Sequence, residues 1–141
     1  MRVLGVDFGL RSLGIALSDE GGTLARPLRV LSIASVREAP QAVADVADTS
    51  DVDTIVVGVP LGLEGEERRQ EVRRVERFAR ALRKLSRKDV FLVDESFSSR
   101  EAAEGRDEGD PSLHARAAAL ILQRWLDRPR KAPRRGGGTQ A

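Results

Sequence analysis

The sequence contains no cysteine, only one histidine, and no apolar run long enough to cross a membrane. The absence of cysteine excludes disulfide bonds, zinc–thiolate sites and catalysis by a thiol nucleophile. No charged and apolar leader precedes the first predicted strand. We therefore expect a cytoplasmic protein that does not associate with membranes.

Charged side chains, in contrast, are abundant and nearly balanced. The 141 residues include 24 Lys and Arg and 22 Asp and Glu, for a formal net charge of +2, and 40% of them are hydrophobic. These totals indicate one globular domain with a core of its own. The C-terminal tail is basic and has no core residues. We predict a single domain over residues 1–128 and a basic, disordered tail over residues 129–141.

The N-terminal stretch MRVLGVDFGLRSLGIALSD, residues 1–19, predicts two strands joined by a tight turn. Asp7 ends the apolar run of the first strand, and Gly9 opens the turn. A buried carboxylate is costly unless a cation or hydrogen-bond donors compensate it. Asp7 is therefore the first candidate functional residue. Gly9 could approach a phosphate, although the turn alone would explain it.

The remaining chain predicts alternating strands and helices. We expect strands over residues 23–33, 53–59 and 90–93 and helices over residues 40–48, 66–87, 99–104 and 112–127. Pro27 cannot donate to a strand ladder, so the strand that contains it should lie at a sheet edge. The element order predicts an α/β fold with a five-stranded mixed sheet, an antiparallel three-strand meander plus parallel strands, flanked by helices. Ribonuclease H-like domains have this order.

Acidic residues follow two of the predicted strands, Asp7 after the first and Asp94 and Glu95 after the fifth. Sheet geometry can bring such carboxylates to one rim, where they would hold Mg²⁺ or Mn²⁺. A metal there could activate water and neutralise charge on a phosphate during phosphodiester cleavage. The spacing alone fits ordinary acids that cap turns or helices equally well.

Two further features have both a functional and a purely structural interpretation. His114 lies in the first turn of the last predicted helix, where a lone histidine is more often a surface or core residue than a ligand. The arginines of the helix over residues 66–87 could follow a nucleic-acid backbone. Glutamates lie among them, which favours an ion-paired, solvated face for part of that helix.

Several stretches resemble the YqgF (RuvX) family, which comprises Holliday junction resolvases and pre-16S rRNA nucleases of bacteria. They occur in family order and cover nearly the whole chain except the tail. The matching pieces are VDFGLRSLGIALSD at residues 6–19, ARPL at 25–28, IVVGVPLGLEGEE at 55–67, LVDES at 92–96 and AAALILQRWL at 117–126.

The resemblance implies a ribonuclease H-like fold and a nuclease that uses Mg²⁺ or Mn²⁺. It assigns Asp7 and Glu95 as catalytic carboxylates and metal ligands. His114 stands where the family usually has its third aspartate, which makes it the candidate third catalytic residue and ligand. Asp107 and Asp110, just upstream, are the alternatives for that position.

The resemblance also implies residues that contact the substrate. Ser96 replaces an arginine that the family usually has, and Arg100 is the candidate replacement. The matching motifs contribute the other candidate substrate-binding residues, which are Gly9, Arg11, Pro60 and Gly65.

The expected function is divalent-metal-dependent hydrolysis of phosphodiester bonds in 5′-end processing of pre-16S rRNA. Branched or single-stranded DNA is the other substrate class that the family suggests. A catalytically impaired nucleic-acid-binding module of the same fold is the alternative, because of His114 and Ser96. An ATP-binding domain ranks last, since the chain is too short for two lobes. The sequence leaves monomer and homodimer open.

Overall fold

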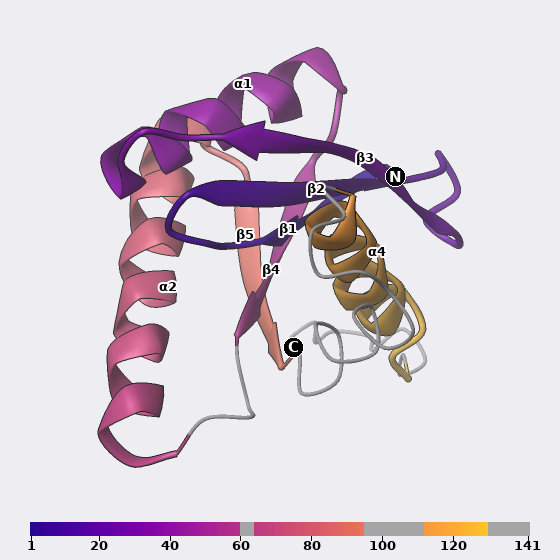
Figure 1. Cartoon of the computed structure of the whole chain (residues 1–141). Helices are drawn as coiled ribbons and strands as arrows, with labels where there is room; N and C mark the ends of the chain where they lie inside the picture. The colour runs from indigo at the N-terminus through magenta and orange to yellow at the C-terminus, as the bar shows by residue number, and fades with distance from the viewer. Residues whose placement is uncertain (60–63, 95–111, 130–141) are drawn as a thin grey trace, which may run out of the picture.

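The computed structural model describes residues 1–59, 64–94 and 112–129 (Figure 1). The predicted helix over residues 99–104 and the tail from residue 130 onward lie outside these ranges. No helix within them is both long enough and apolar enough to span a membrane. The elements in chain order are β1 (Val3–Asp7), β2 (Ser12–Ser18), β3 (Ala25–Ser32), η1 (Val36–Glu38), α1 (Ala39–Thr49), β4 (Thr54–Val59), α2 (Gly65–Ser86), β5 (Asp89–Asp94) and α4 (Leu113–Leu126).

The strands form one five-stranded sheet in the order β3-β2-β1-β4-β5. β1 pairs antiparallel with β2, and β2 with β3, whereas β1–β4 and β4–β5 are parallel. The predicted meander plus parallel strands is confirmed. β3 lies at the edge, as Pro27 indicated, and Pro27 pairs with Ala16 where the register shifts.

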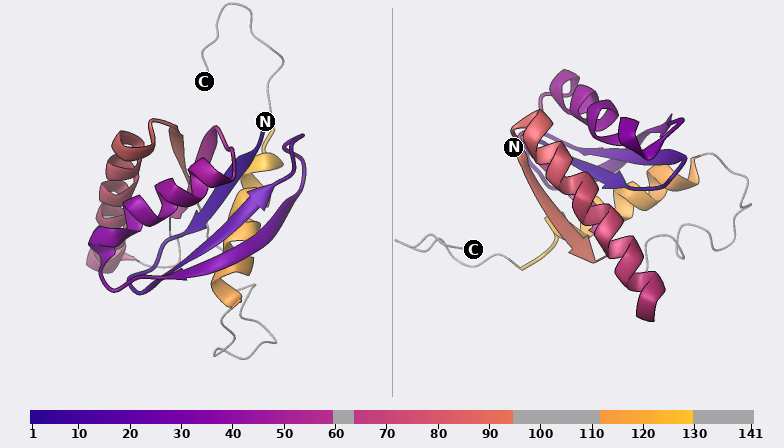
Figure 2. Two further views of the ribbon diagram at one scale, coloured as in Figure 1. Left: turned by 90° about the horizontal axis from the view of Figure 1, so that it is seen from above. Right: turned by 90° about the vertical axis from the view of Figure 1, so that its left-hand side faces the viewer.

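Helices cover both faces of the sheet, with α1 and α2 on one side and α4 on the other (Figure 2). Alternation along β1 divides its side chains between these two layers. Leu4 and Val6 belong to the core beneath α1 and α2, while Val3 packs against α4. β4 is buried along its whole length, as expected for a central strand covered on both faces.

Two glycines let α4 lie directly on the sheet. A Cβ atom at Gly5 would come within 2.9 Å of the Ala118 carbonyl oxygen, and one at Gly14 within 1.9 Å of the His114 carbonyl oxygen. A larger residue at either position would collide with helix backbone, which cannot rotate aside as a side chain can. The helix therefore runs along β1 and β2 with its first turn over Gly14, opposite the end of β1.

The variant Gly14→Ala tests this close approach. We expect it to destabilise the protein by about 2 kcal/mol or more, because the added methyl group forces α4 away from the sheet. Urea denaturation of the two proteins measures the change. Gly21→Ala is the matched control, since a Cβ there would meet only ordinary contacts, the nearest 3.8 Å away. Equal stability of the two variants would contradict the packing described.

Candidate active site

Asp7 is the last residue of β1 and is buried, with 6% of its surface exposed. Its backbone pairs with Gly14 on β2, and its side chain lies on the face of the sheet that α4 covers. Central strands on both sides and the helix above hold this carboxylate in place. Asp7 is therefore a fixed acid at the end of a buried strand, as the sequence predicted.

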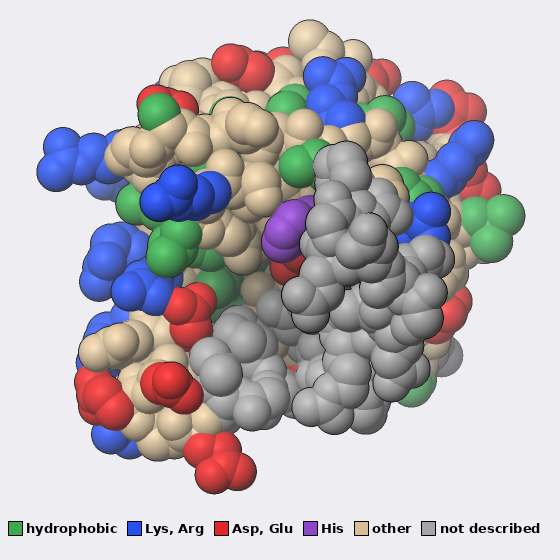
Figure 3. Space-filling model, in the orientation of Figure 1, with side chains coloured by type: hydrophobic (Ala, Val, Ile, Leu, Met, Phe, Trp, Pro, Cys, Tyr) green, Lys and Arg blue, Asp and Glu red, His purple; other side chains and the backbone are tan. Residues whose placement is uncertain are grey.

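His114 contacts Asp7, although 107 residues separate the two in sequence. The imidazole Nδ1 lies 3.1 Å from Oδ2 of Asp7, a hydrogen-bond distance. Half of the imidazole is exposed, whereas the carboxylate beneath it is almost covered. Figure 3 shows the histidine at the surface of the molecule. The pair thus combines a buried acid with an accessible base.

The electrostatics of the pair affect His114 in particular. Its hydrogen bond to Asp7 raises the pKa of the imidazole above the ordinary 6.5, partial burial opposes this, and the negative charge of Asp7 adds to the increase. In the metal-free protein, the neighbouring carboxylate therefore favours the protonated form of His114.

The geometry of the pair fits two ligands of one divalent cation. Adjacent ligand atoms around an octahedral ion lie about 3 Å apart, because each bond is about 2.1 Å long. The observed separation between Nδ1 and Oδ2 is 3.1 Å. An imidazole nitrogen is a softer donor than a carboxylate oxygen, so the pair suits Mn²⁺ at least as well as Mg²⁺. Within residues 1–59, 64–94 and 112–129, no third acid or histidine joins this pair.

Asp94, the first residue of the second predicted acidic pair, lies at the same end of the sheet as Asp7. β1, β4 and β5 are parallel, so Asp7 and Asp94 both lie at the carboxyl ends of their strands. Asp94 is exposed and stands two strands from Asp7, a separation of about 10 Å. Glu95, the predicted ligand, is the next residue and lies outside the described residues, as do Asp107 and Asp110.

Three of the five predicted substrate-binding residues, Gly9, Arg11 and Gly65, lie within the described ranges. A Cβ at Gly9 would approach the Ser12 carbonyl oxygen to 2.6 Å, so the β1–β2 turn itself requires glycine there. Arg11 is exposed in that turn. Gly65 begins α2 with a φ of 62°, a conformation that favours glycine. Pro60 and Arg100 lie outside the described residues.

Part of the basic face of α2 is ion-paired, as the interleaved glutamates indicated. Arg69 and Arg73 both contact Glu66, and Arg74 contacts Glu71. Exposed pairs of this kind contribute little to stability. They do reduce the positive charge that α2 can offer to a nucleic-acid backbone.

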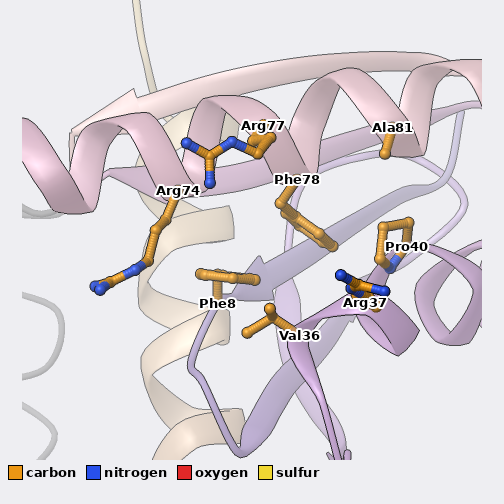
Figure 4. Close-up of a pocket in the computed structure, with 8 residues that line it drawn as sticks. All are labelled: Phe8, Val36, Arg37, Pro40, Arg74, Arg77, Phe78 and Ala81. Atoms are coloured by element: carbon orange, nitrogen blue, oxygen red, sulfur yellow. The ribbon is translucent and has the colours of Figure 1, made fainter.

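The structure also contains a pocket beside Phe8 that the sequence patterns do not predict. The Phe8 ring packs against Phe78 of α2, with ring centroids 4.8 Å apart. Both rings line a pocket of about 300 Å³ between α2 and the η1–α1 segment (Figure 4). The sequence feature that points to this pocket is the position of Phe8 directly after Asp7. Because alternation places consecutive strand residues on opposite faces, Phe8 is expected on the face of the sheet opposite Asp7.

Comparison with known proteins identifies the family. A sequence model of the family described as "RuvX: Holliday junction resolvase" matches residues 1–128. The chain belongs to the RuvX family. This confirms the resemblance seen in the motifs, and it confirms that the chain is a nuclease, a hydrolase of phosphodiester bonds.

Curated relatives of this RuvX family chain match it along most of their length. A protein of Synechococcus elongatus is 36% identical over 146 residues, covering 97% of this chain and 95% of the relative. A protein of Anaeromyxobacter is 38% identical over 134 residues, covering 90% and 97%. Both are named "Putative pre-16S rRNA nuclease".

Solved structures similar to this RuvX family chain confirm the ribonuclease H-like fold. One is "T. thermophilus RuvC in complex with Holliday junction substrate", with a TM-score of 0.61, 19% identity, and coverage of 89% of this chain and 94% of that one. Another is the Fowlpox virus resolvase with its Holliday junction DNA, with a TM-score of 0.51, 11% identity, and coverage of 91% and 100%.

The hydrogen bond between His114 and Asp7 predicts a titration that NMR can follow. In the metal-free protein, the pKa of His114 should lie above 6.5, and Asp7→Asn should lower it because the ionised partner is lost. His114 is the only histidine, so its ring protons are assigned without ambiguity. Asp89→Asn, at the opposite end of the sheet, should leave the titration unchanged. An identical pKa in Asp7→Asn would contradict the observed contact.

Proposed function

We propose that this RuvX family chain hydrolyses phosphodiester bonds with a bound divalent cation, Mg²⁺ or Mn²⁺, and that its substrate is the precursor of 16S ribosomal RNA. The observation that supports metal dependence is the contact between Asp7 and His114, whose facing atoms have the spacing of two ligands of one ion. The names of the curated relatives support RNA as the substrate.

Three residues are proposed to hold the cation. Asp7 and His114 supply one oxygen and one nitrogen, and Glu95, directly after β5, is proposed as the further carboxylate. Asp107 and Asp110 are the alternatives if His114 is not a ligand. The bound cation would activate a water molecule and neutralise the charge that develops on the phosphate.

The surroundings of Asp7 suit this role. Its burial limits the access of water to the carboxylate, and a lower local dielectric strengthens attraction to a cation. The first turn of α4, held against Gly14, fixes the backbone of His114. Both ligands therefore come from rigid elements, which keeps the site preorganised.

The substrate strand is proposed to enter beside the β1–β2 turn. Arg11 is exposed there and can contact a phosphate without reading sequence. Gly9, Pro60 and Gly65 are proposed as further contacts because they match the family motifs, and Arg100 is proposed as the replacement for the arginine that the family usually has at the position of Ser96. Residues 1–128 would form the nuclease domain, and the basic tail over residues 129–141 would add loose phosphate contacts.

The variant Asp7→Asn tests the metal-dependent mechanism. We expect cleavage to fall by about a hundredfold or more, since a bound cation contributes several kcal/mol to such reactions. The assay measures cleavage of an end-labelled 16S rRNA precursor fragment and of a four-way DNA junction, with Mg²⁺, Mn²⁺ or EDTA. Asp89→Asn controls for the loss of an acid elsewhere on the sheet.

Parent-level cleavage by Asp7→Asn would overturn this mechanism. Faster cleavage of the DNA junction than of the RNA fragment by the parent protein would overturn the proposed substrate. Binding without cleavage in any metal would instead support the catalytically impaired module.

Substitution of His114 tests its role as the third ligand. His114→Ala should reduce cleavage, because it removes one donor, whereas His114→Asp should retain it, because aspartate restores a carboxylate at that position. We expect the ratio of the activity with Mn²⁺ to the activity with Mg²⁺ to be smaller in the aspartate variant than in the parent protein. Cleavage by His114→Ala at the parent rate would assign the third ligand to Asp107 or Asp110.

A further inference from the structure

The pocket beside Phe8 lies on the opposite face of the sheet from the Asp7–His114 pair. Its apolar wall comes from Phe8 at the end of β1, Phe78 of α2, and Val36 and Pro40 of the η1–α1 segment. Figure 4 shows Phe78 extending from α2 toward Phe8. The volume of about 300 Å³ is at the lower end of the range for small-ligand pockets. A flat group the size of one nucleobase fits that description.

Arginines also contribute to the lining of this pocket. Arg37, Arg74 and Arg77 all line the pocket. Arg74 is paired with Glu71, but within the described ranges no carboxylate lies at ion-pair distance from the side chain of Arg37 or Arg77. Two guanidinium groups that have no carboxylate partner in the described part of the chain lie beside an apolar, aromatic surface. They are complementary to a ligand that is flat and apolar at one end and anionic at the other.

A nucleotide has that distribution of chemistry. Its base can stack on an aromatic ring, and its phosphate can accept hydrogen bonds from guanidinium groups. Stacking on aromatic side chains does not require a particular base. An unpaired nucleotide fits better than a paired one, because only an unpaired base can leave its strand to enter a pocket.

The pocket is adjacent to the candidate active site along the chain. Asp7 and Phe8 are consecutive residues, so their Cα atoms are about 3.8 Å apart while their side chains lie on opposite faces of the sheet. A strand that crosses the end of β1 can therefore place one phosphate at Asp7 and a nearby base against Phe8.

We propose that the pocket formed by Phe8, Phe78, Arg37 and Arg77 binds one unpaired nucleotide of the substrate strand, close to the phosphate that is cleaved. The base lies against the aromatic wall, and Arg37 and Arg77, on either side of Phe78, contact phosphates of the same strand. This inference rests on the proposed nuclease function, and it adds a positioning site that would favour single-stranded segments over duplex.

The experiment uses a short single-stranded RNA with one 2-aminopurine at a series of positions. Binding is measured in EDTA, so that metal-dependent cleavage does not occur. Stacking quenches the fluorescence of 2-aminopurine, and we expect strong quenching at one position of the strand. Free AMP is tested as a competitor, to separate a nucleotide held within a strand from a free mononucleotide.

Two variants and one control address the pocket directly. Ala81→Leu fills it from α2, and the double variant Arg37→Ala, Arg77→Ala removes the cationic groups without touching the core. Each should weaken RNA binding about tenfold, and Ala81→Leu should abolish the quenching. Arg80→Ala is the matched control, because Arg80 is exposed on α2 and does not line the pocket.

Position-specific quenching that is lost in Ala81→Leu and kept in Arg80→Ala would support the proposal. The proposal would be overturned if the quenching were unchanged in Ala81→Leu, or if Arg80→Ala lost as much quenching as Ala81→Leu. It would also be overturned if AMP competed with the same affinity as the RNA. Position-specific quenching in a protein that cleaves no substrate would refute the nuclease function but not the pocket. Normal cleavage by the parent protein, with no effect of the pocket variants on RNA binding or quenching, would refute the proposed nucleotide site and leave the nuclease function standing.

Discussion

The close packing of α4 on the sheet determines where the chemistry of this RuvX family chain can occur. Gly5 and Gly14 offer no side chains, so the helix backbone lies against β1 and β2. Its first turn then places His114 beside Asp7 at 3.1 Å. Without this contact Asp7 would be a buried acid with no partner among the described residues, a costly arrangement. The fold and the candidate active site therefore depend on the same pair of small residues.

Two candidate binding sites lie on opposite faces of the sheet at the end of β1. Alternation directs Asp7 to the α4 side, where acid and imidazole meet, and directs Phe8 to the α2 side, where an aromatic and arginine-lined pocket lies. A cation site and a base site on two faces of one strand end would let the protein fix both the phosphate and a neighbouring nucleotide. Positioning of this kind accounts for much of the rate enhancement in phosphoryl chemistry.

The sequence predicted those features that depend on local pattern. The apolar run of β4, the proline that marks β3 as an edge strand and the acid that ends β1 all have local physical causes, and each prediction is confirmed. The contact of His114 with Asp7 spans 107 residues, and only the packing of α4 creates it. The pocket depends on three segments that converge on Phe8, so no single stretch could reveal it. The role of Glu95 stays a prediction.

A titration of the metal-free protein with Mn²⁺, followed by proton NMR of His114, tests most directly whether the pair binds a cation. Paramagnetic Mn²⁺ broadens the resonances of protons close to it, and the chain has one histidine to observe. If Asp7 and His114 are ligands, the His114 ring resonances broaden at low Mn²⁺ in the parent protein and stay sharp at the same concentration in Asp7→Asn. Sharp His114 resonances in the parent at saturating Mn²⁺ would contradict a cation site at this pair.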